Sequence, residues 1–142
     1  EWNVDPKRLG VIGFSAGGNL AAKSACPVEP RSYAALDKTD TLPCRPDFAV
    51  LVYPAYLDKA GQVAPDLNLK ADLPPLLIVH NEDDKSYVPG SKLLHAALES
   101  AKVPHGIKLY ATGGHGYGLR CTKDAKVWPE DTLKWLAENH LR

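Results

Sequence analysis

The sequence lacks a surplus of charge of either sign, since 17 Lys and Arg balance 17 Asp and Glu over 142 residues. A nucleic-acid-binding domain normally carries excess positive charge to neutralise phosphates, so the balance argues against that class. It argues equally against an acidic disordered tail. Long hydrophobic runs are also absent. The longest, Phe48 to Leu57, is interrupted by Pro54, whereas about 20 apolar residues are needed to cross a bilayer. We therefore expect no nucleic-acid partner and no membrane.

Cysteine is scarce. Cys26, Cys44 and Cys121 are far apart and show no C-x-x-C spacing, so a zinc site is not expected. Their odd number leaves at least one thiol outside any disulfide within the chain, and a bridge between Cys44 and Cys121 stays open. The polar segment Glu1 to Leu9 holds no apolar stretch typical of a signal peptide. The sequence does not assign a cellular compartment.

Four short apolar runs are typical of strands in a parallel sheet. They cover Leu9 to Phe14, Phe48 to Tyr53, Leu76 to His80 and Ile107 to Ala111. Each is apolar along nearly its whole length, as in parallel strands that are buried on both faces. Helical patterns follow the first, third and fourth runs, over Asn19 to Ala25, Ser91 to Lys102 and Trp128 to Leu141. This alternation predicts an α/β fold, a mostly parallel sheet flanked by helices, as a single domain over residues 1–142.

The last predicted helix is amphipathic. Its spacing predicts that one face packs on the sheet, made of Leu133, Leu136, Ala137, His140 and Leu141. Two long segments that contain several prolines, Cys26 to Pro46 and Asp58 to Pro75, are predicted to be loops.

The first predicted strand lacks a neighbour on one side. Leu9 to Phe14 has the pattern of a central strand, yet only a short polar segment precedes it. A central strand pairs on both sides, because unpaired backbone groups and uncovered apolar side chains are costly. We therefore expect a missing N-terminal segment or an oligomer partner to cover this edge. We favour the first, which makes residues 1–142 the C-terminal part of a larger domain.

A G-x-S-x-G motif, Gly13 to Gly17, lies where the first strand ends and the first helix begins. In this context the motif is typical of a nucleophile elbow, a tight turn that raises a serine hydroxyl above the sheet edge. A serine in an ordinary turn is the weaker alternative. We expect glycine to be required at positions 13 and 17, because a side chain at either would press on neighbouring backbone. Ser15 is the candidate nucleophile, and the backbone N–H of Ala16 is the candidate oxyanion donor.

A serine hydroxyl needs a base, normally a histidine that is oriented by a carboxylate. Asp83 and Asp84 follow the third predicted strand, and His115 follows the fourth, within Gly113-Gly114-His115-Gly116. The carboxyl ends of parallel strands meet at one sheet edge, where open α/β folds place their sites. Physical reasoning does not decide which aspartate faces the histidine. We expect the other to be a solvated turn residue.

The remaining histidines predict neither catalysis nor a metal site. His95, His105 and His140 lie in predicted helices or turns, and His80, at a strand end, is expected to pack or to form hydrogen bonds. No group of His, Cys, Asp and Glu has metal-ligand spacing, and the glycines do not form G-x-G-x-x-G. We therefore expect no metal and no cofactor.

Three segments carry a family resemblance: Leu9 to Leu20, Pro75 to Asp84 and Gly113 to Leu119. They resemble the α/β-hydrolase superfamily, and within it the acetyl-xylan-esterase-like and lipase/esterase branch of small carboxylesterases. The resemblance implies a serine esterase that hydrolyses short, acetyl-type esters of small molecules or of carbohydrate such as xylan, through an acyl-enzyme. It also implies Asp84, rather than Asp83, as the acid that completes a triad with Ser15 and His115.

The resemblance further implies strands before the elbow and a His-Gly-Gly-type loop that supplies a second oxyanion donor, neither of which is found in this sequence. Asp58 to Pro74 is too short for the helical cap of many such hydrolases, so an open site is expected. Two alternatives are kept. One is a non-catalytic, hydrolase-like fragment that binds or assembles, and the other is a serine peptidase with the same triad.

Overall fold

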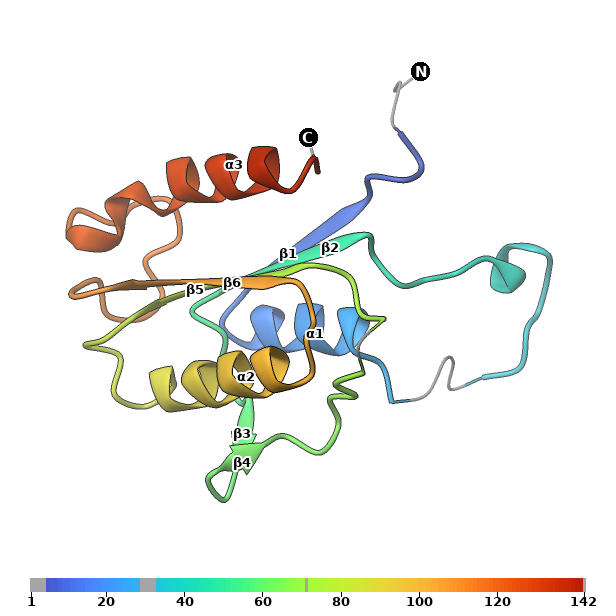
Figure 1. Cartoon of the computed structure of the whole chain (residues 1–142), viewed down its shortest axis with the longest axis horizontal. Coiled ribbons are helices and arrows are strands. Elements are labelled where there is room, and N and C mark those ends of the chain that lie inside the picture. The colour runs from blue at the N-terminus through green and yellow to red at the C-terminus, as the bar shows by residue number, and fades with distance from the viewer. Residues whose placement is uncertain (1–4, 29–32, 71, 142) are drawn as a thin grey trace.

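The computed structural model describes residues 5–28, 33–70 and 72–141 (Figure 1). Positions 1–4 of the polar N-terminal segment, 29–32 of the first predicted loop, 71 of the second, and 142 lie outside the described residues. A four-stranded sheet in the order β1-β2-β5-β6 forms the centre of the fold. Its strands are β1 (Gly10–Phe14), β2 (Phe48–Val52), β5 (Leu76–Asn81) and β6 (His105–Tyr110). All three strand pairs are parallel, so the predicted α/β class is confirmed.

Helices cover both faces of this sheet. They are α1 (Ala16–Ala25), α2 (Val88–Ser100) and α3 (Trp128–Glu138). Figure 1 shows α1 and α2 on one side of the sheet and α3 on the other. The side chains of a strand point alternately to its two faces, and the two central strands are apolar at every position but the last two of β5. This pattern buries both strands from both sides, as the unbroken apolar runs predicted.

Each face of the sheet has its own apolar core. On the side of α1 and α2, the central strands contribute Ala49, Leu51, Leu76 and Ile78. On the side of α3 they contribute Val50, Val52, Leu77 and Val79, which pack with Trp128 and Trp135. Burying each larger side chain stabilises the fold by about 1.5–3 kcal/mol. The sheet is thereby a rigid frame for the loops at its carboxyl edge.

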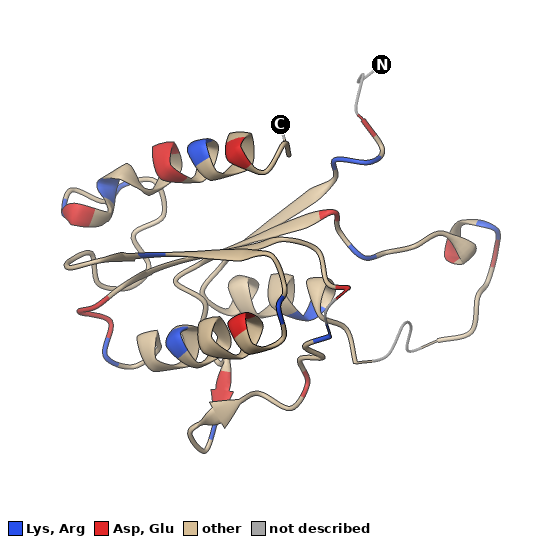
Figure 2. Ribbon diagram, viewed as in Figure 1, with Lys and Arg blue, Asp and Glu red and all other residues tan. Residues whose placement is uncertain are grey.

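Charged side chains lie mostly outside this frame. Among the four strands of the sheet, Lys108 of β6 is the one Lys, Arg, Asp or Glu. Figure 2 shows Lys and Arg interspersed with Asp and Glu along the helices and loops, in keeping with the balanced charge of the sequence. Within the described residues, no helix combines the length and the apolar character that crossing a bilayer requires.

The strand β1 lies at an edge of the sheet, as the lack of a neighbour in the sequence predicted. Within the described residues it pairs with β2 alone. Its apolar side chains are correspondingly open, with Ile12 49% and Phe14 37% exposed. That a further segment or chain covers this edge stays a prediction.

The predicted face of the last helix is right in part, since Leu136 and Leu141 pack against the apolar core on the α3 side of the sheet. The buried residues of the helix are Trp128, Thr132 and Trp135, whereas Leu133 is 53% exposed. His140 lies beyond the helix end, with a φ of 57°. The helix turns its two tryptophans to the sheet because they bury the most area, and Trp128 also donates a hydrogen bond from Nε1 to the carbonyl of Gly118 at 2.9 Å.

Three short elements were not expected from the sequence. An antiparallel hairpin of β3 (Asp58–Lys59) and β4 (Gln62–Val63) lies in the second proline-containing loop and contacts α2. Two 3₁₀ helices cover Thr39–Thr41 and Asp124–Val127. The bridge between Cys44 and Cys121 is not formed.

Candidate active site

Ser15 lies in a strained turn between β1 and α1. Its φ is 53°, in the left-handed region that residues other than glycine rarely adopt. The turn is held on the end of β2. The N–H of Ser15 donates to the carbonyl of Val52 at 3.1 Å, and the carbonyl of Ser15 accepts from Ala55 at 3.0 Å. Ala16 is the first residue of α1, so its N–H is one of those without an acceptor inside the helix. The turn therefore has the strained form that the motif predicts.

The glycines of the motif are not equivalent. A Cβ at Gly13 would collide with the carbonyl of Gly17, so position 13 requires glycine. A Cβ at Gly17 would meet nothing within 4 Å, and the prediction that glycine is required there is wrong. Position 17 lies on the exposed side of the first helical turn. The tight approach is made by Gly18 instead, where a Cβ would lie 2.9 Å from Cβ of Pro54.

We expect Gly13→Ala and Gly17→Ala to affect stability in opposite directions. The first substitution forces helix and strand apart and is expected to cost about 1–3 kcal/mol of unfolding free energy. The second adds a better helix former in open space and is expected to leave stability unchanged or to raise it by up to about 1 kcal/mol. Urea denaturation followed by circular dichroism measures both. Equal losses in the two variants would contradict this view of the turn.

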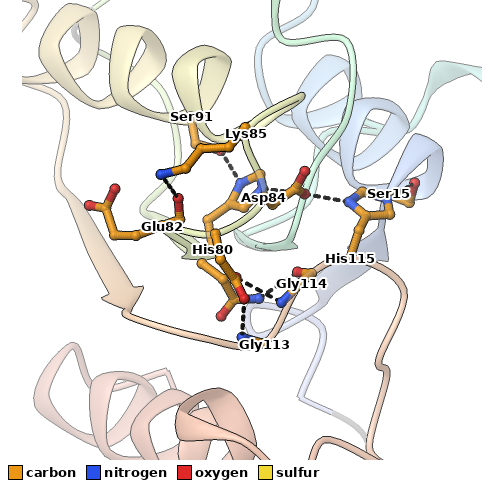
Figure 3. A network of polar contacts seen from close by, with 11 residues as sticks. Ser15, His80, Glu82, Asp84, Lys85, Ser91, Gly113, Gly114 and His115 are labelled. Atoms are coloured by element: carbon orange, nitrogen blue, oxygen red, sulfur yellow. Dashed lines mark hydrogen bonds and ion pairs between the residues drawn. The ribbon is translucent and has the colours of Figure 1, made fainter.

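Ser15, His115 and Asp84 are joined by two hydrogen bonds. Oγ of Ser15 lies 2.7 Å from Nε2 of His115, and Nδ1 of His115 lies 2.6 Å from Oδ2 of Asp84 (Figure 3). An ionised carboxylate only accepts, so Nδ1 carries the proton, and Nε2 of the neutral ring accepts from the serine hydroxyl. Asp84 comes from the loop between β5 and α2, and His115 from the loop after β6. The fold thus brings together three of the residues that the sequence singled out.

Asp84 is poised to stay ionised. Its side chain is 5% exposed, and this burial acts to raise its pKa. Hydrogen bonds from His80 and His115 act in the opposite direction and prevail, so the pKa of Asp84 lies below its ordinary value.

Asp83 has a different task. Its carboxylate accepts hydrogen bonds from the backbone N–H groups of Gly114 at 2.8 Å and Gly113 at 3.2 Å, and these bonds lower its pKa. From the end of β5, Nδ2 of Asn81 donates to the carbonyl of Gly114 at 2.8 Å. The expectation that one of the two aspartates is a solvated turn residue is confirmed for Asp83. Asp83 is exposed, but it ties down the loop that carries His115.

Aromatic rings flank His115. The rings of Tyr53 and Tyr87 each lie 5.0 Å from the imidazole, centroid to centroid. An open pocket of about 710 Å³ adjoins this cluster and is lined by Phe14, Tyr53, Gly116, Tyr117, Gly118, Leu119 and Arg120. Its volume is within the range of small-molecule sites. Sequence reasoning missed Tyr53 and Tyr87, because the contact depends on how three separate loops are folded.

His80 forms hydrogen bonds, as predicted, and it does so with the site itself. It is fully buried, with Nε2 3.0 Å from Oδ2 of Asp84 and Nδ1 2.7 Å from Oγ of Ser91. The potential ligand atoms of His80, Asp84 and His115 all lie within 4.8 Å of one another, a spacing that a cation could use. Their hydrogen bonds to the shared carboxylate account for this proximity, and we assign them no metal.

Comparisons with known proteins find relatives of this chain in sequence and in fold. The family model of the dienelactone hydrolase family matches residues 1–138. The acetyl ester-xyloside bifunctional hydrolase from Caldicellulosiruptor lactoaceticus is similar in structure, with a TM-score of 0.83 and 30% identity. The match covers 98% of this chain and 59% of that hydrolase. A propionate-bound esterase from Thermogutta terrifontis shares the fold, with a TM-score of 0.78, 21% identity, and coverage of 97% of this chain and 58% of its own.

A curated acetylxylan esterase from Xylanibacter ruminicola is 26% identical to this chain. The match covers 83% of this chain and 28% of the esterase. The chain therefore spans less than two thirds of the length of each of these relatives.

Proposed function

Because this chain belongs to the dienelactone hydrolase family, within the α/β-hydrolase superfamily, we propose that it is a serine carboxylesterase for short, acetyl-type esters. The observation that carries the proposal is the unbroken hydrogen-bond chain from Ser15 through His115 to Asp84, with links of 2.7 and 2.6 Å. A hydroxyl, an imidazole and a buried carboxylate in this order are what acyl transfer to serine requires.

In the proposed mechanism, Oγ of Ser15 attacks the ester carbonyl carbon while Nε2 of His115 takes the hydroxyl proton. Asp84 holds the proton on Nδ1 and stabilises the imidazolium. The N–H of Ala16, at the start of α1, donates to the oxyanion of the tetrahedral intermediate. His115 then passes its proton to the departing alcohol, which leaves an acyl group on Ser15. In the second half, water attacks the acyl group, gives its proton to His115, and the carboxylic acid departs as the hydroxyl of Ser15 is restored.

The choice of acetyl esters rests on two supports. Two of the three relatives named above are an acetylxylan esterase and an acetyl ester-xyloside hydrolase, so acetylated carbohydrate such as xylan is the proposed substrate class. The pocket beside His115 is open, which suits a small acyl group on a bulky alcohol better than a long acyl chain that needs an enclosed apolar tunnel.

Parallel assays test the proposal. We expect p-nitrophenyl acetate to be hydrolysed with a higher kcat/KM than the butyrate or decanoate ester, and acetate to be released from acetylated xylan. A fluorophosphonate probe is expected to label Ser15, which peptide mass spectrometry locates. A peptide p-nitroanilide serves as the comparison substrate and is expected to be cleaved far more slowly.

Each other outcome has a definite meaning. A folded protein that neither hydrolyses these esters nor reacts with the fluorophosphonate would be a non-catalytic binding domain. Faster release of p-nitroaniline than of p-nitrophenol would make it a serine peptidase.

A further inference from the structure

Asp84 lies between two serine–histidine pairs (Figure 3). On the open side, His115 links its carboxylate to Ser15. On the inner side, His80 links it to Ser91, with Nε2 of His80 3.0 Å from Oδ2 of Asp84 and Nδ1 of His80 2.7 Å from Oγ of Ser91. The same oxygen, Oδ2, thus receives both imidazoles.

The proton positions in the inner pair follow from the chemistry of the groups. The carboxylate only accepts hydrogen bonds, so Nε2 of His80 carries a proton and donates a hydrogen bond to Asp84. Burial lowers the pKa of His80 more than the neighbouring carboxylate raises it, so the ring is neutral and Nδ1 is bare. Ser91 must then donate its hydroxyl proton to Nδ1. The carboxylate thus selects the tautomer of His80, and the Ser91 hydroxyl, which can donate as well as accept, donates to the bare Nδ1 and holds the ring in place.

The inner pair is not a second active site. His80 and Ser91 are both 0% exposed, so no ester can reach the Ser91 hydroxyl. Their location instead suits a support. His80 belongs to β5 in the middle of the sheet, and Ser91 belongs to α2, so the two residues connect Asp84 to the two elements that border its loop.

We propose that His80, held in place by its hydrogen bond to Ser91, is a positioning residue that fixes the Asp84 carboxylate for its hydrogen bond to His115. This inference rests on the proposed function, in which that bond orients the catalytic base. Nε2 of His80 donates a hydrogen bond to Oδ2 of Asp84, and Ser91 holds the same imidazole ring at Nδ1. Without that donor the carboxylate is free to rotate in its loop, and the 2.6 Å contact with Nδ1 of His115 is no longer enforced.

Two substitutions of His80 test the contributions of its two ring nitrogens one at a time. Glutamine places its amide nitrogen close to the position of Nε2 and keeps a donor for Asp84. Asparagine places its amide close to Nδ1 and keeps a polar contact for Ser91 but none for Asp84. We expect His80→Asn to lower kcat for p-nitrophenyl acetate by about 10–100-fold with KM unchanged, because a hydrogen bond to a charged group is lost. His80→Gln is expected to retain most of kcat.

A spectroscopic readout tests positioning without reference to turnover. The proton on Nδ1 of His115 lies in a short, charge-assisted hydrogen bond and is expected to give a far-downfield ¹H NMR resonance. This resonance is expected to persist in His80→Gln and to shift upfield or disappear in His80→Asn. His105→Asn is the matched control. His105 is partly buried and, like His80, hydrogen-bonded to a second side chain, His95 at 2.8 Å, and its hydrogen bonds within the described residues do not involve Asp84.

Equal kcat and an unchanged resonance in the Asn and Gln variants would overturn the proposal. If His80→Asn does not fold, Ser91→Ala decides in its place. Its expected result is a several-fold loss of kcat and a shifted resonance, and wild-type values for both would overturn the proposal. The proposed function and the positioning role of His80 can be contradicted independently of each other. A wild-type protein without esterase activity contradicts the proposed function, whereas the His115 resonance still reports whether His80 positions Asp84.

Discussion

Replacing Ser15 with alanine is expected to lower kcat for p-nitrophenyl acetate by about 10⁴–10⁶. The proposed reaction forms a covalent bond from Oγ of Ser15 to the acyl carbon, and the variant lacks this oxygen, which lies 2.7 Å from Nε2 of His115. KM is expected to change little, because the walls of the pocket remain. Initial rates over a range of ester concentrations measure both constants. Labelling by the fluorophosphonate should disappear together with activity.

Ser24→Ala is the matched control for this experiment. Ser24 lies on the same helix, α1, and its hydroxyl donates to the carbonyl of Leu20 at 2.9 Å on an exposed surface, away from the three linked residues. Its removal is expected to leave kcat and labelling unchanged. Ester hydrolysis at the wild-type rate by Ser15→Ala would refute the proposed nucleophile.

Replacing Asp84 with asparagine is expected to lower kcat by about 10⁴. The asparagine amide cannot hold the proton on Nδ1 of His115 as a carboxylate does, and its NH₂ group favours the opposite tautomer. In that tautomer Nε2 carries the proton and cannot take another from Ser15. The lowered pKa of Asp84 means that the group is ionised throughout the neutral range, so the loss is expected at every pH at which the enzyme works.

Asp83→Asn is the comparison that separates the two neighbouring aspartates. Its amide oxygen can still accept from Gly114, so the loop that carries His115 keeps an anchor. We expect kcat to fall by less than about tenfold, in line with the loss of one hydrogen bond. If Asp83→Asn is the more damaging of the pair, Asp84 is not the acid. Measuring both variants at one pH with the same ester decides between them.

Much of the fold could be predicted because its signals are local. Residues such as Leu76 to Val79 are apolar without alternation, which only a strand buried on both faces accommodates, and the sheet is parallel as expected. The family resemblance is confirmed by the match of the dienelactone hydrolase model. Expectations failed where burial depends on neighbours that the pattern does not name. Leu133 is apolar but exposed, because the tryptophans occupy the inner face of its helix, whereas the exposure of Ile12 on an edge strand was expected.

The residues of the site likewise fall into those that local sequence signals predicted and those that only tertiary contacts identified. A G-x-S-x-G motif after a strand singles out Ser15, and a histidine between glycines after a later strand singles out His115, so both were expected from the order of residues alone. The sequence could not choose between Asp83 and Asp84 on physical grounds, since adjacent aspartates have the same chemistry. Only the tertiary structure separates them, by directing one carboxylate to the backbone of Gly113 and Gly114 and the other to the imidazole.

What the sequence by itself determined, then, is the kind of sheet, the strained turn at Ser15 and the edge at which the chemistry gathers. These follow from steric limits and apolar patterns that act over a few residues. Only the tertiary structure decided which carboxylate forms the hydrogen bond to His115. It also decided that the buried His80 and Ser91 are linked by hydrogen bonds to that carboxylate. A hydrogen bond requires a donor–acceptor distance set to within fractions of an ångström and a suitable angle. Residues far apart in the chain reach that precision only after the core has packed.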